Sequence, residues 1–273
     1  MTDVQSADQT ADGARPLAVV TGASSGIGLE LAREFARNGF DLLDTAEDAG
    51  LDATVGPLEA LGARVEAVRA DLRTSRGVDA LYARIQAAGP VDAVALNAGV
   101  GCGGAFVDND LQDELDLIAL NVASTVHLAK HVIRDMVARG EGRVLFTSSI
   151  AALMPGSFAA VYNASKAFVQ SFAEAVRDEL KGTGVTVTAL QPGPTEANFF
   201  HRADMEDTKM GQSKTKADPA KVARDGFEAL MAGDDHVVSG LMNKVLATIA
   251  HVTPDPLLAK QHRGMAEPGS GEK

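Results

Sequence analysis

The sequence has few of the residues that build disulfides, thiolate metal sites or membrane anchors. Of its 273 residues, one is cysteine, Cys102, and none is tryptophan. A single thiol excludes an internal disulfide and a metal site built on several thiolates, and it favours a reducing, cytoplasmic compartment. Nothing basic lies near Cys102 in the sequence to lower the pKa of its thiol, so we interpret it as a small spacer. No apolar run approaches the roughly 20 residues that a transmembrane helix needs, so no membrane span is expected.

Positive charge is also scarce. The chain has 25 Lys and Arg residues against 37 Asp and Glu, for a formal net charge of -12. An acidic protein repels the phosphates of nucleic acids and of anionic membranes, so neither is expected as a partner. Apolar residues make up 45% of the chain and charged residues 23%, which is typical of a globular protein, and the length suits one large α/β domain.

That domain is expected over residues 16–254. Residues 1–15 are polar and acidic and have neither the basic start nor the apolar core of a secretory signal, so we interpret them as a disordered lead-in. Residues 255–273 are interpreted as a C-terminal tail. The end of that tail, 267–273, is rich in Pro, Gly and Ser and is expected to fray.

Short apolar runs alternate with helical patterns along the domain. Strands that alternate with helices predict an α/β fold with a doubly wound parallel sheet, covered on both faces. From Leu111 the apolar positions recur in steps of three and four, which predicts a long helix that ends before Gly140. Asn121 lies beside this apolar stripe, so its amide must be hydrogen-bonded. The predicted strands cover residues 17–21, 41–47, 64–70, 91–96, 142–148, 185–191 and 236–239.

The first strand leads through a glycine-rich turn into a helix. The turn reads Gly22-Ala23-Ser24-Ser25-Gly26-Ile27-Gly28. Its glycines allow a tight turn and a close approach of the backbone to a pyrophosphate, whose charge is favoured by the free N–H groups at a helix N-terminus. This pattern indicates a dinucleotide site, and the alternative is a tight turn that binds nothing.

The end of the second strand bears on which dinucleotide is bound. Glu47 can accept hydrogen bonds from the 2′-hydroxyl of adenosine and would repel a 2′-phosphate, so NAD(H) is favoured over NADP(H). The alternative is that Glu47 is a solvated residue at the start of a helix. Asp44 does not fit a strand that is buried on both faces, and it either reaches the ribose or occupies a strained or hydrated position.

Two further turns follow strands at the same edge of the predicted sheet. Asp71 either caps the next helix or accepts a hydrogen bond from the adenine amine. Asn97-Ala98-Gly99 ends the fourth strand with small residues. They either let a ligand lie flat against the backbone or form a plain turn.

Ser149, Tyr162 and Lys166 carry the candidate chemistry. In a helix, Tyr162 and Lys166 lie one turn apart on the same face, which puts an ammonium beside a phenol and favours the phenolate. Such a tyrosine can give or take a proton. Ser149, thirteen residues before Tyr162 at the end of an apolar strand, can orient a carbonyl or alcohol oxygen with its hydroxyl. By itself, the Tyr-x-x-x-Lys spacing also occurs by chance on surface helices.

The segment 196–217 is long and irregular, as substrate lids often are. Its aromatic and methionine side chains, with those near the catalytic segment, favour an apolar or aromatic carbonyl substrate. His201 within this segment is interpreted as a solvated loop histidine rather than a catalytic group. The candidate substrate contacts are Met154, Phe158 and Phe199, together with Ser149 and Tyr162.

The chain resembles the short-chain dehydrogenase/reductase family from Leu17 to about Ser239. The motifs that carry the resemblance occur in the family's order and at its spacings: Thr21-Gly22-x-x-x-Gly26-x-Gly28, Asn97-Ala98-Gly99, Asn121, Ser149, Tyr162-x-x-x-Lys166 and Pro192-Gly193. The resemblance implies a seven-stranded Rossmann-type sheet and a reaction that interconverts a secondary alcohol and a ketone with a nicotinamide dinucleotide, without a metal. It also implies a homodimer or homotetramer, paired through the helices that begin near Leu111 and Phe158.

The resemblance also assigns roles to residues. Tyr162 is the general acid or base, Ser149 orients the substrate oxygen, and Lys166 lowers the pKa of Tyr162 and holds the nicotinamide ribose. Asn121 anchors a water that links Lys166 to solvent. The implied cofactor-binding set is Gly22, Ser24, Ser25, Gly26, Ile27, Gly28, Glu47, Asp71, Leu72, Asn97, Ala98, Gly99, Tyr162, Lys166, Pro192, Gly193 and Thr195.

Two features depart from the family pattern. Ala46 stands 24 residues after Gly22, where NAD-preferring relatives usually carry aspartate, and Asp44 has no counterpart. One rival interpretation is a sugar-nucleotide epimerase or dehydratase, which shares the tyrosine–lysine pair but is usually longer and has a differently spaced glycine turn. Another is a sensor that binds the dinucleotide without turnover, which the intact Asn121, Ser149, Tyr162 and Lys166 argue against.

Overall fold

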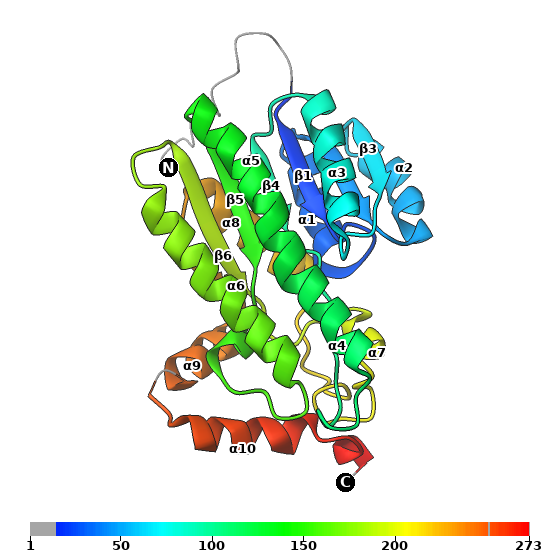
Figure 1. The fold of residues 1–273 in the computed structure, drawn as a ribbon, viewed down its shortest axis with the longest axis vertical. Helices are drawn as coiled ribbons and strands as arrows, with labels where there is room; N and C mark the ends of the chain where they lie inside the picture. Colours follow the sequence, from blue (N-terminus) through cyan, green and yellow to red (C-terminus); the bar gives the residue numbers. More distant parts are fainter. Residues whose placement is uncertain (1–14, 251, 273) are drawn as a thin grey trace, which may run out of the picture.

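The computed structural model describes residues 15–250 and 252–272, and a parallel sheet of seven strands forms its centre (Figure 1). The strands lie in the order β3-β2-β1-β4-β5-β6-β7, and each neighbouring pair is parallel. This confirms the predicted doubly wound α/β fold. The strands are β1 (Leu17–Thr21), β2 (Asp41–Ala46), β3 (Val65–Arg69), β4 (Ala93–Leu96), β5 (Gly142–Thr147), β6 (Val185–Gln191) and β7 (His236–Val238).

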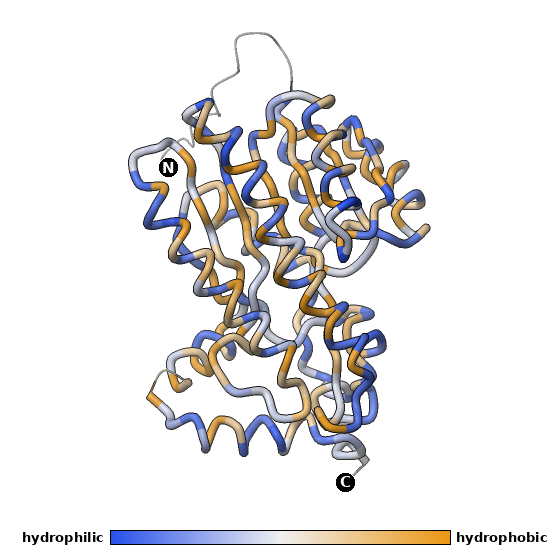
Figure 2. Tube along the Cα trace, in the orientation of Figure 1, coloured by the Kyte–Doolittle hydropathy of each residue, from blue (hydrophilic) through white to orange (hydrophobic). Residues whose placement is uncertain are grey.

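Helices cover both faces of the sheet and form two cores. Figure 1 shows α3 (Ser75–Ala88), α5 (Thr125–Arg139) and α6 (Ala160–Glu179) in front of the sheet, with α1 (Gly26–Arg37) and α8 (Pro219–Ala232) behind it. Alternate strand residues feed the two cores, since the β2 side chains of Leu42 and Leu43 belong to different clusters. Figure 2 shows the strands as mainly hydrophobic and the outer sides of the helices as hydrophilic. Each large apolar side chain buried in this way contributes about 1.5–3 kcal/mol.

The strand order places the candidate site. Successive strands are added in one direction from β1 to β3 and in the opposite direction from β4 to β7, so the strand order reverses between β1 and β4. Open α/β sheets bind ligands at such a point, in the crevice outside the carboxyl ends of the strands. The turns after β1, β4 and β5 all reach this edge. They carry the glycine-rich turn, Asn97-Ala98-Gly99 and Ser149.

The long helix predicted from Leu111 is present, but it is not uniform. It consists of α4 (Leu111–Ile118), a π turn (Ala119–Ser124) and α5, and it ends at Gly140 in the left-handed region at φ +81°. The wider π turn contains Asn121. Such turns are frequent at functional sites because they re-aim side chains and loosen the regular backbone hydrogen bonding.

Asp44 lies at the centre of β2 and is fully buried. Neither of its carboxylate oxygens has a hydrogen-bond partner among the described residues, and burial raises the pKa of Asp44 to about 8. A carboxyl group with that pKa is mostly protonated at neutral pH. Asp44 is therefore a neutral acid within the core, and it does not line the cavity where a ribose would bind.

The C-terminal residues differ from the predicted tail. They form α9 (Leu241–Ala250) and α10 (Asp255–Ala266), and α10 lies across the bottom of the molecule in Figure 1. Leu258, His262 and Ala266 are buried at intervals of four residues, which gives α10 one packed face in a largely polar helix. The end expected to fray also has contacts, since the Gly271 amide donates to the Asp207 carbonyl at 2.9 Å.

Three further segments complete the description. Residues 1–14 of the predicted lead-in lie outside the described residues, whereas Arg15 forms an ion pair with Asp41 at 3.2 Å. Segment 196–217 contains one short helix, α7 (Phe199–Arg202), and a parallel bridge between Thr195 and Ala217 closes its base. Within residues 15–250 and 252–272, every helix is too short or too polar to cross a bilayer. The remaining helix, α2 (Val55–Glu59), precedes β3.

Candidate active site

A cavity of about 800 Å³ opens at the carboxyl edge of the sheet. The turns after the central strands form one wall, and α6, segment 196–217, α9 and α10 form the others. This volume is at the upper end of the range for small-molecule and cofactor sites. Most of the residues predicted to bind cofactor or substrate line it: Gly22, Ser24, Ser25, Gly26, Ile27, Glu47, Asp71, Leu72, Asn97, Ala98, Gly99, Ser149, Met154, Tyr162, Lys166, Pro192, Gly193, Thr195 and Phe199.

The glycine-rich turn brings bare backbone to the cavity at the start of α1. Gly22 and Gly26 have φ values of +73° and +57°, which only glycine adopts without strain. Gly28 does not line the cavity. A Cβ atom at Gly28 would lie 2.0 Å from the carbonyl oxygen of Gly22, so this glycine lets α1 pack against the turn. The turn and the helix N-terminus together fit a pyrophosphate.

The turn after β4 is tied to β1. The Thr21 hydroxyl accepts hydrogen bonds from the amides of Asn97 and Ala98, both at 2.9 Å. A Cβ atom at Gly99 would lie 3.1 Å from Oδ1 of Asn121 and 3.4 Å from Nζ of Lys166. Gly99 therefore gives room to the side chains of Asn121 and Lys166, and the ligand expected to lie against this turn stays a prediction.

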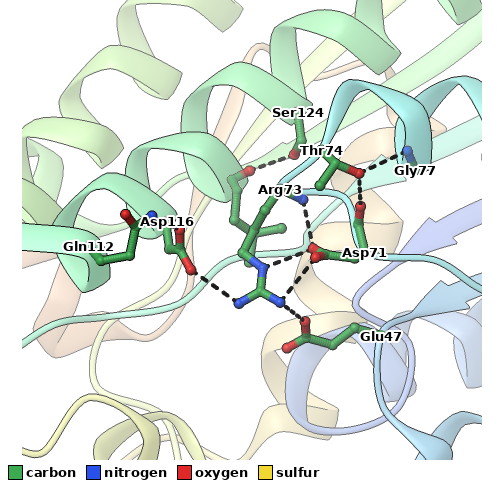
Figure 3. Close-up of polar contacts among 9 residues, drawn as sticks. Glu47, Asp71, Arg73, Thr74, Gly77, Gln112, Asp116 and Ser124 are labelled. Carbon is green, nitrogen blue, oxygen red and sulfur yellow. Dashed lines mark hydrogen bonds and ion pairs between the residues drawn. The ribbon is translucent and has the colours of Figure 1, made fainter.

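An arginine that sequence analysis did not single out organises the predicted adenosine end (Figure 3). The guanidinium of Arg73 donates to Asp71 from Nε at 2.8 Å, and it pairs with Glu47 at 3.0 Å and with Asp116 at 3.4 Å. The hydrogen bond from Arg73 holds the pKa of Asp71 below its usual value. All three partners are carboxylates, so the positive charge of Arg73 is balanced at this end of the cavity.

The same end corrects one prediction and adds one residue. Asp71 does not cap α3, because the Thr74 hydroxyl accepts the hydrogen bond from the Gly77 amide. Asp48 was also not predicted. It lines the cavity, and one of its oxygens accepts a 2.7 Å hydrogen bond from the Ser24 hydroxyl of the glycine-rich turn. A search for charged residues within four positions of the ends of β2 and β3 would have found both Asp48 and Arg73.

Asn121 lies behind the cavity wall rather than on it. Its Oδ1 accepts from the Val100 amide at 2.9 Å, and its Nδ2 donates to the Val100 carbonyl at 2.9 Å and to the Ser165 hydroxyl at 3.0 Å. The buried amide is hydrogen-bonded, as its position beside the apolar stripe required. The side chain braces the turn after β4 against α6 and uses both of its amide hydrogens, while Oδ1 keeps a lone pair, so the water that the resemblance implied stays a prediction.

Ser149, Tyr162 and Lys166 meet on one wall of the cavity. Ser149 follows β5, and its hydroxyl accepts from the Ala151 amide at 3.1 Å and donates to the Pro192 carbonyl at 3.3 Å. Tyr162 and Lys166 lie one turn apart on α6, with the Lys166 ammonium 5.9 Å from the centre of the Tyr162 ring. Lys166 also donates to the carbonyl of Thr147 at 2.9 Å, which directs its side chain across the end of β5.

Burial determines the protonation of this pair. It raises the pKa of Tyr162 to about 12, although the nearby Ser149 hydroxyl acts in the opposite direction, and it lowers the pKa of Lys166 to about 8. The expected lowering of the tyrosine pKa by Lys166 is therefore wrong for this structure, because loss of hydration outweighs the distant ammonium. At neutral pH Tyr162 is a phenol that can donate a proton.

The other end of the cavity is apolar and rich in methionine. The Phe199 ring lies 5.1 Å from the Tyr162 ring, between centroids, and Met154 lies nearby on the same lining. Phe158 does not line the cavity, contrary to prediction. Its backbone has φ +64°, and its ring packs beneath Arg263 of α10, 4.9 Å away. The further apolar lining residues are Met205, Met210, Leu241, Met242, Leu246 and Met265.

Three other polar side chains can be assigned. His262 of α10 was hidden in the predicted tail, yet it lines the cavity and is 3% exposed. Its Nδ1 donates to the Ser157 carbonyl at 2.8 Å, and burial lowers its pKa, so the ring is neutral. His201 is exposed and pairs with Glu206, which confirms that it is solvated, although it lies on the short helix α7 rather than in a loop. Burial raises the pKa of Cys102 to about 11, which makes this thiol unreactive.

Comparison with known proteins agrees with this geometry. The sequence profile of the short chain dehydrogenase family matches residues 16–208. The ketoacyl reductase HetN of Nostoc sp. is 31% identical over 177 residues, which cover 64% of this chain and 62% of that protein. An uncharacterized short-chain type dehydrogenase/reductase of Sinorhizobium fredii, y4eK, is 35% identical over 188 residues, 68% of this chain and 73% of that protein.

A solved structure extends the similarity beyond the matched region. The short-chain dehydrogenase from Sphingobium yanoikuyae, in complex with NADPH, superposes with a TM-score of 0.79 at 27% identity. The superposition covers 87% of this chain and 93% of that one. The family profile alone spans well over half of the sequence, so the chain belongs to the short-chain dehydrogenase family.

Proposed function

We propose that this protein interconverts a secondary alcohol and a ketone with a nicotinamide dinucleotide, and that Tyr162 is its general acid and base. The observation that carries the proposal is the position of the Tyr162 phenol and the Ser149 hydroxyl on one wall of a cavity whose far end is the glycine-rich turn. A ligand that spans this cavity would have a phosphate-binding backbone at one end and a proton donor at the other.

The dinucleotide fits the residues present. Positive φ values at Gly22 and Gly26 and the crowding at Gly28 leave bare backbone facing the space where a pyrophosphate would lie. Lys166, with one donor engaged by Thr147, has others free for ribose hydroxyls. When bound, the nicotinamide supplies or accepts the hydride.

The chain's own residues manage the proton and the substrate oxygen. Tyr162 is protonated at neutral pH, so it can donate its proton to a carbonyl oxygen during reduction and recover it from the alcohol during oxidation. The Ser149 hydroxyl donates a long hydrogen bond to Pro192, at 3.3 Å, so it can turn to donate to the same oxygen while it still accepts from the Ala151 amide. The apolar walls around Phe199 exclude water, which strengthens both hydrogen bonds.

We infer that NAD(H) is favoured over NADP(H). Glu47, Asp48 and Asp71 place three carboxylates at the adenosine end, and a 2′-phosphate there would meet like charge. Two cations lie near these carboxylates and both are paired, Arg73 with Glu47 and Asp71, and Arg202 with Asp48 at 3.7 Å. These three carboxylates would thus take the role of the aspartate that NAD-preferring relatives usually carry at the position of Ala46.

The substrate class follows from the opposite end. Methionine and phenylalanine side chains there favour an apolar or aromatic ketone and its alcohol, and the flexible methionines would let the wall adapt to more than one shape. The name of the Nostoc relative, a ketoacyl reductase, supports carbonyl reduction as the chemistry.

The decisive experiment is Tyr162→Phe, assayed for reduction of a panel of ketones with NADH and with NADPH. Loss of general acid catalysis is expected to lower the rate by roughly 10²–10⁴-fold while NADH binding, followed by calorimetry, is kept. Full activity in Tyr162→Phe would reject the mechanism. A wild-type protein that binds dinucleotide but reduces nothing in the panel would support the sensor interpretation instead.

We also expect a cytoplasmic homodimer or homotetramer, built on α4 and α6. Exposed apolar side chains gather on these helices, with Leu111, Leu115 and Ile118 on α4 and Phe168 on α6 exposed by 70%, 47%, 41% and 42%. Exposed patches of this kind often mark contact surfaces. Analytical ultracentrifugation at micromolar concentration tests this, and a monomer there would reject it.

A further inference from the structure

A cluster of polar side chains joins two helices outside the cavity. Asp79 of α3 faces His127 and His131 of α5. Oδ1 of Asp79 lies 3.0 Å from Nε2 of His127 and 3.9 Å from Nε2 of His131. The ligand atoms of all three side chains lie within 4.8 Å of one another. None of these residues lines the cavity, so the oxidoreductase chemistry does not account for their arrangement.

The two histidines are spaced to act together. Residues four apart lie on the same face of a helix, and the two ring centroids are 5.2 Å apart. Both Nε2 atoms converge on one carboxylate oxygen, so three donor atoms surround a single point between α3 and α5. In a tetrahedral zinc site with bonds of about 2.0–2.2 Å, ligand atoms are about 3.4 Å apart. The observed 3.0 Å and 3.9 Å lie on either side of this value, so small side-chain rotations suffice.

Neighbouring side chains hold one of the rings in place. His131 stacks on Tyr82 of α3, with centroids 4.3 Å apart and planes at 19°. The Tyr82 hydroxyl donates to Asp135 at 2.7 Å and accepts from Gln86 at 3.0 Å, which fixes the tyrosine in turn. Side chains that are ordered before a ligand arrives lose less conformational entropy on binding it.

The cluster is also open to solvent. The side chains of His127, His131 and Asp79 are 29%, 33% and 60% exposed. An ion could therefore reach all three without any opening of the fold, and water could complete its coordination.

We propose that Asp79, His127 and His131 form a binding site for a divalent transition metal ion, with Zn²⁺ the best match, that braces α3 against α5. Two imidazole nitrogens and one carboxylate oxygen are a ligand set that zinc takes with water in the fourth position. Ca²⁺ and Mg²⁺ are poorly matched, because they prefer oxygen ligands in greater number. The site is separate from the proposed oxidoreduction and does not depend on it.

The test is calorimetric titration of ZnCl₂ into the full chain, with any affinity tag removed. One ion is expected per chain, and thermal unfolding with zinc at about 100 times its dissociation constant is expected to shift upward by about 5 °C or more. His127→Gln and His131→Gln should each weaken binding by more than the roughly 10–100-fold that loss of an outer-shell partner costs. Asp79→Asn tests the same site from the other helix.

The matched control is His236→Gln. His236 is an exposed histidine that also pairs with an aspartate, Asp235, but it lies on β7 and outside the cluster. Zinc affinity should be unchanged in this variant. The proposal is overturned if wild-type protein takes up no zinc, or if the His127→Gln/His131→Gln double variant binds zinc as tightly as wild type.

Discussion

The two ends of the cavity, the proposed cofactor end and the proposed substrate end, are built largely from different parts of the chain and present different groups. Segment 196–217 reaches both, since Arg202 pairs with Asp48 at 3.7 Å. At the cofactor end, turns that directly follow β1 and β4 expose backbone and small side chains, and Gly28 lacks room for even one more carbon. At the substrate end, segment 196–217, α9 and α10 supply methionines, phenylalanines and one buried histidine. The cofactor end is thus fixed by strand geometry, whereas the substrate end depends on side-chain packing between segments that other sequences could replace.

Tyr162 lies where the two ends of the cavity meet, and the pH dependence of the reaction there should be the largest effect. Tyr162 has a pKa of about 12, so at lower pH its phenolate fraction increases about tenfold with each unit of rising pH. Alcohol oxidation needs the phenolate and should therefore rise about 100-fold between pH 6 and 8. Ketone reduction needs the phenol and should lack this rise. Initial rates in both directions at saturating cofactor check this, and an oxidation rate that is flat over this range would contradict it. The pH range ends at 8 because the pKa of Lys166 is about 8, and its ammonium is lost at higher pH.

Glycine substitutions test how rigid the cofactor end is. Gly28→Ala puts a Cβ atom 2.0 Å from the Gly22 carbonyl oxygen, so the turn must move. Overpacking costs the fold about 1–3 kcal/mol, and displacement of the turn is expected to weaken NADH binding by roughly 10–100-fold in calorimetry. Gly264→Ala on α10 is the control, because a Cβ atom there meets nothing within 4 Å and should leave NADH binding unchanged. If the two variants bound NADH equally well, the glycine-rich turn would not be more rigid than the other end of the cavity.

Glu47 tests whether a side chain can decide specificity at an end made mostly of backbone. In Glu47→Ala, one negative charge is lost and Arg73 loses one of its three carboxylate partners. The ratio of NADPH to NADH affinity is expected to rise about tenfold, equivalent to about 1.4 kcal/mol. Asp116→Asn also removes a partner of Arg73, but Asp116 does not line the cavity, so the ratio should change less. An unchanged ratio in Glu47→Ala would reject the role of Glu47.

His262 tests whether the substrate end can be altered alone. His262→Leu removes the hydrogen bond to the Ser157 carbonyl, and a buried hydrogen bond contributes about 1 kcal/mol. KM for the ketone is expected to rise about fivefold, with the dissociation constant of NADH unchanged. The exposed His201→Leu is the control. Weaker NADH binding in His262→Leu would show that the two ends are coupled.

Asp44 provides a test that concerns the stability of the sheet rather than ligand binding or activity. Its folded-state pKa of about 8 lies above the unfolded value near 3.9, so stability from this group is fully present below about pH 4 and is lost as pH rises through 8. Asp44→Val should remove this loss and raise the free energy of unfolding at pH 7 by about 1–4 kcal/mol. Urea unfolding at pH 5 and 8 measures it, and a variant that is less stable than wild type at pH 8 would contradict the burial argument.

Much of the cofactor end was predictable because its residues are consecutive. The glycine-rich turn, Asn97-Ala98-Gly99 and the Tyr162–Lys166 pair each lie within one turn or one helix, and short apolar or alternating runs marked the strands of the sheet. Arg73 was missed because its partner Glu47 lies on another strand's turn, 26 residues earlier.

The substrate end was less predictable because its residues meet only in the folded chain. His262 lies in a helix whose packed face has few apolar residues, so the composition of 255–273 indicated a tail. Phe158 was expected in the cavity on its position near Tyr162, but its positive φ turns the side chain toward α10. Neither outcome follows from a local pattern.

The π turn between α4 and α5 affects how this sequence can tolerate length changes. A regular α-helix advances about 100° per residue, and a π turn accommodates one residue more than an α-turn. The extra residue is absorbed within one wider turn, so the helices on its two sides keep their relative phase. A deletion of one residue within Ala119–Ser124 would therefore restore regular hydrogen bonding, with Leu128 and Val132 still in the core and His127 and His131 still facing α3. The same deletion within the regular part of α5 would rotate the residues that follow it by about 100°. The π turn is thus a place where this helix tolerates a change in length that its regular turns do not.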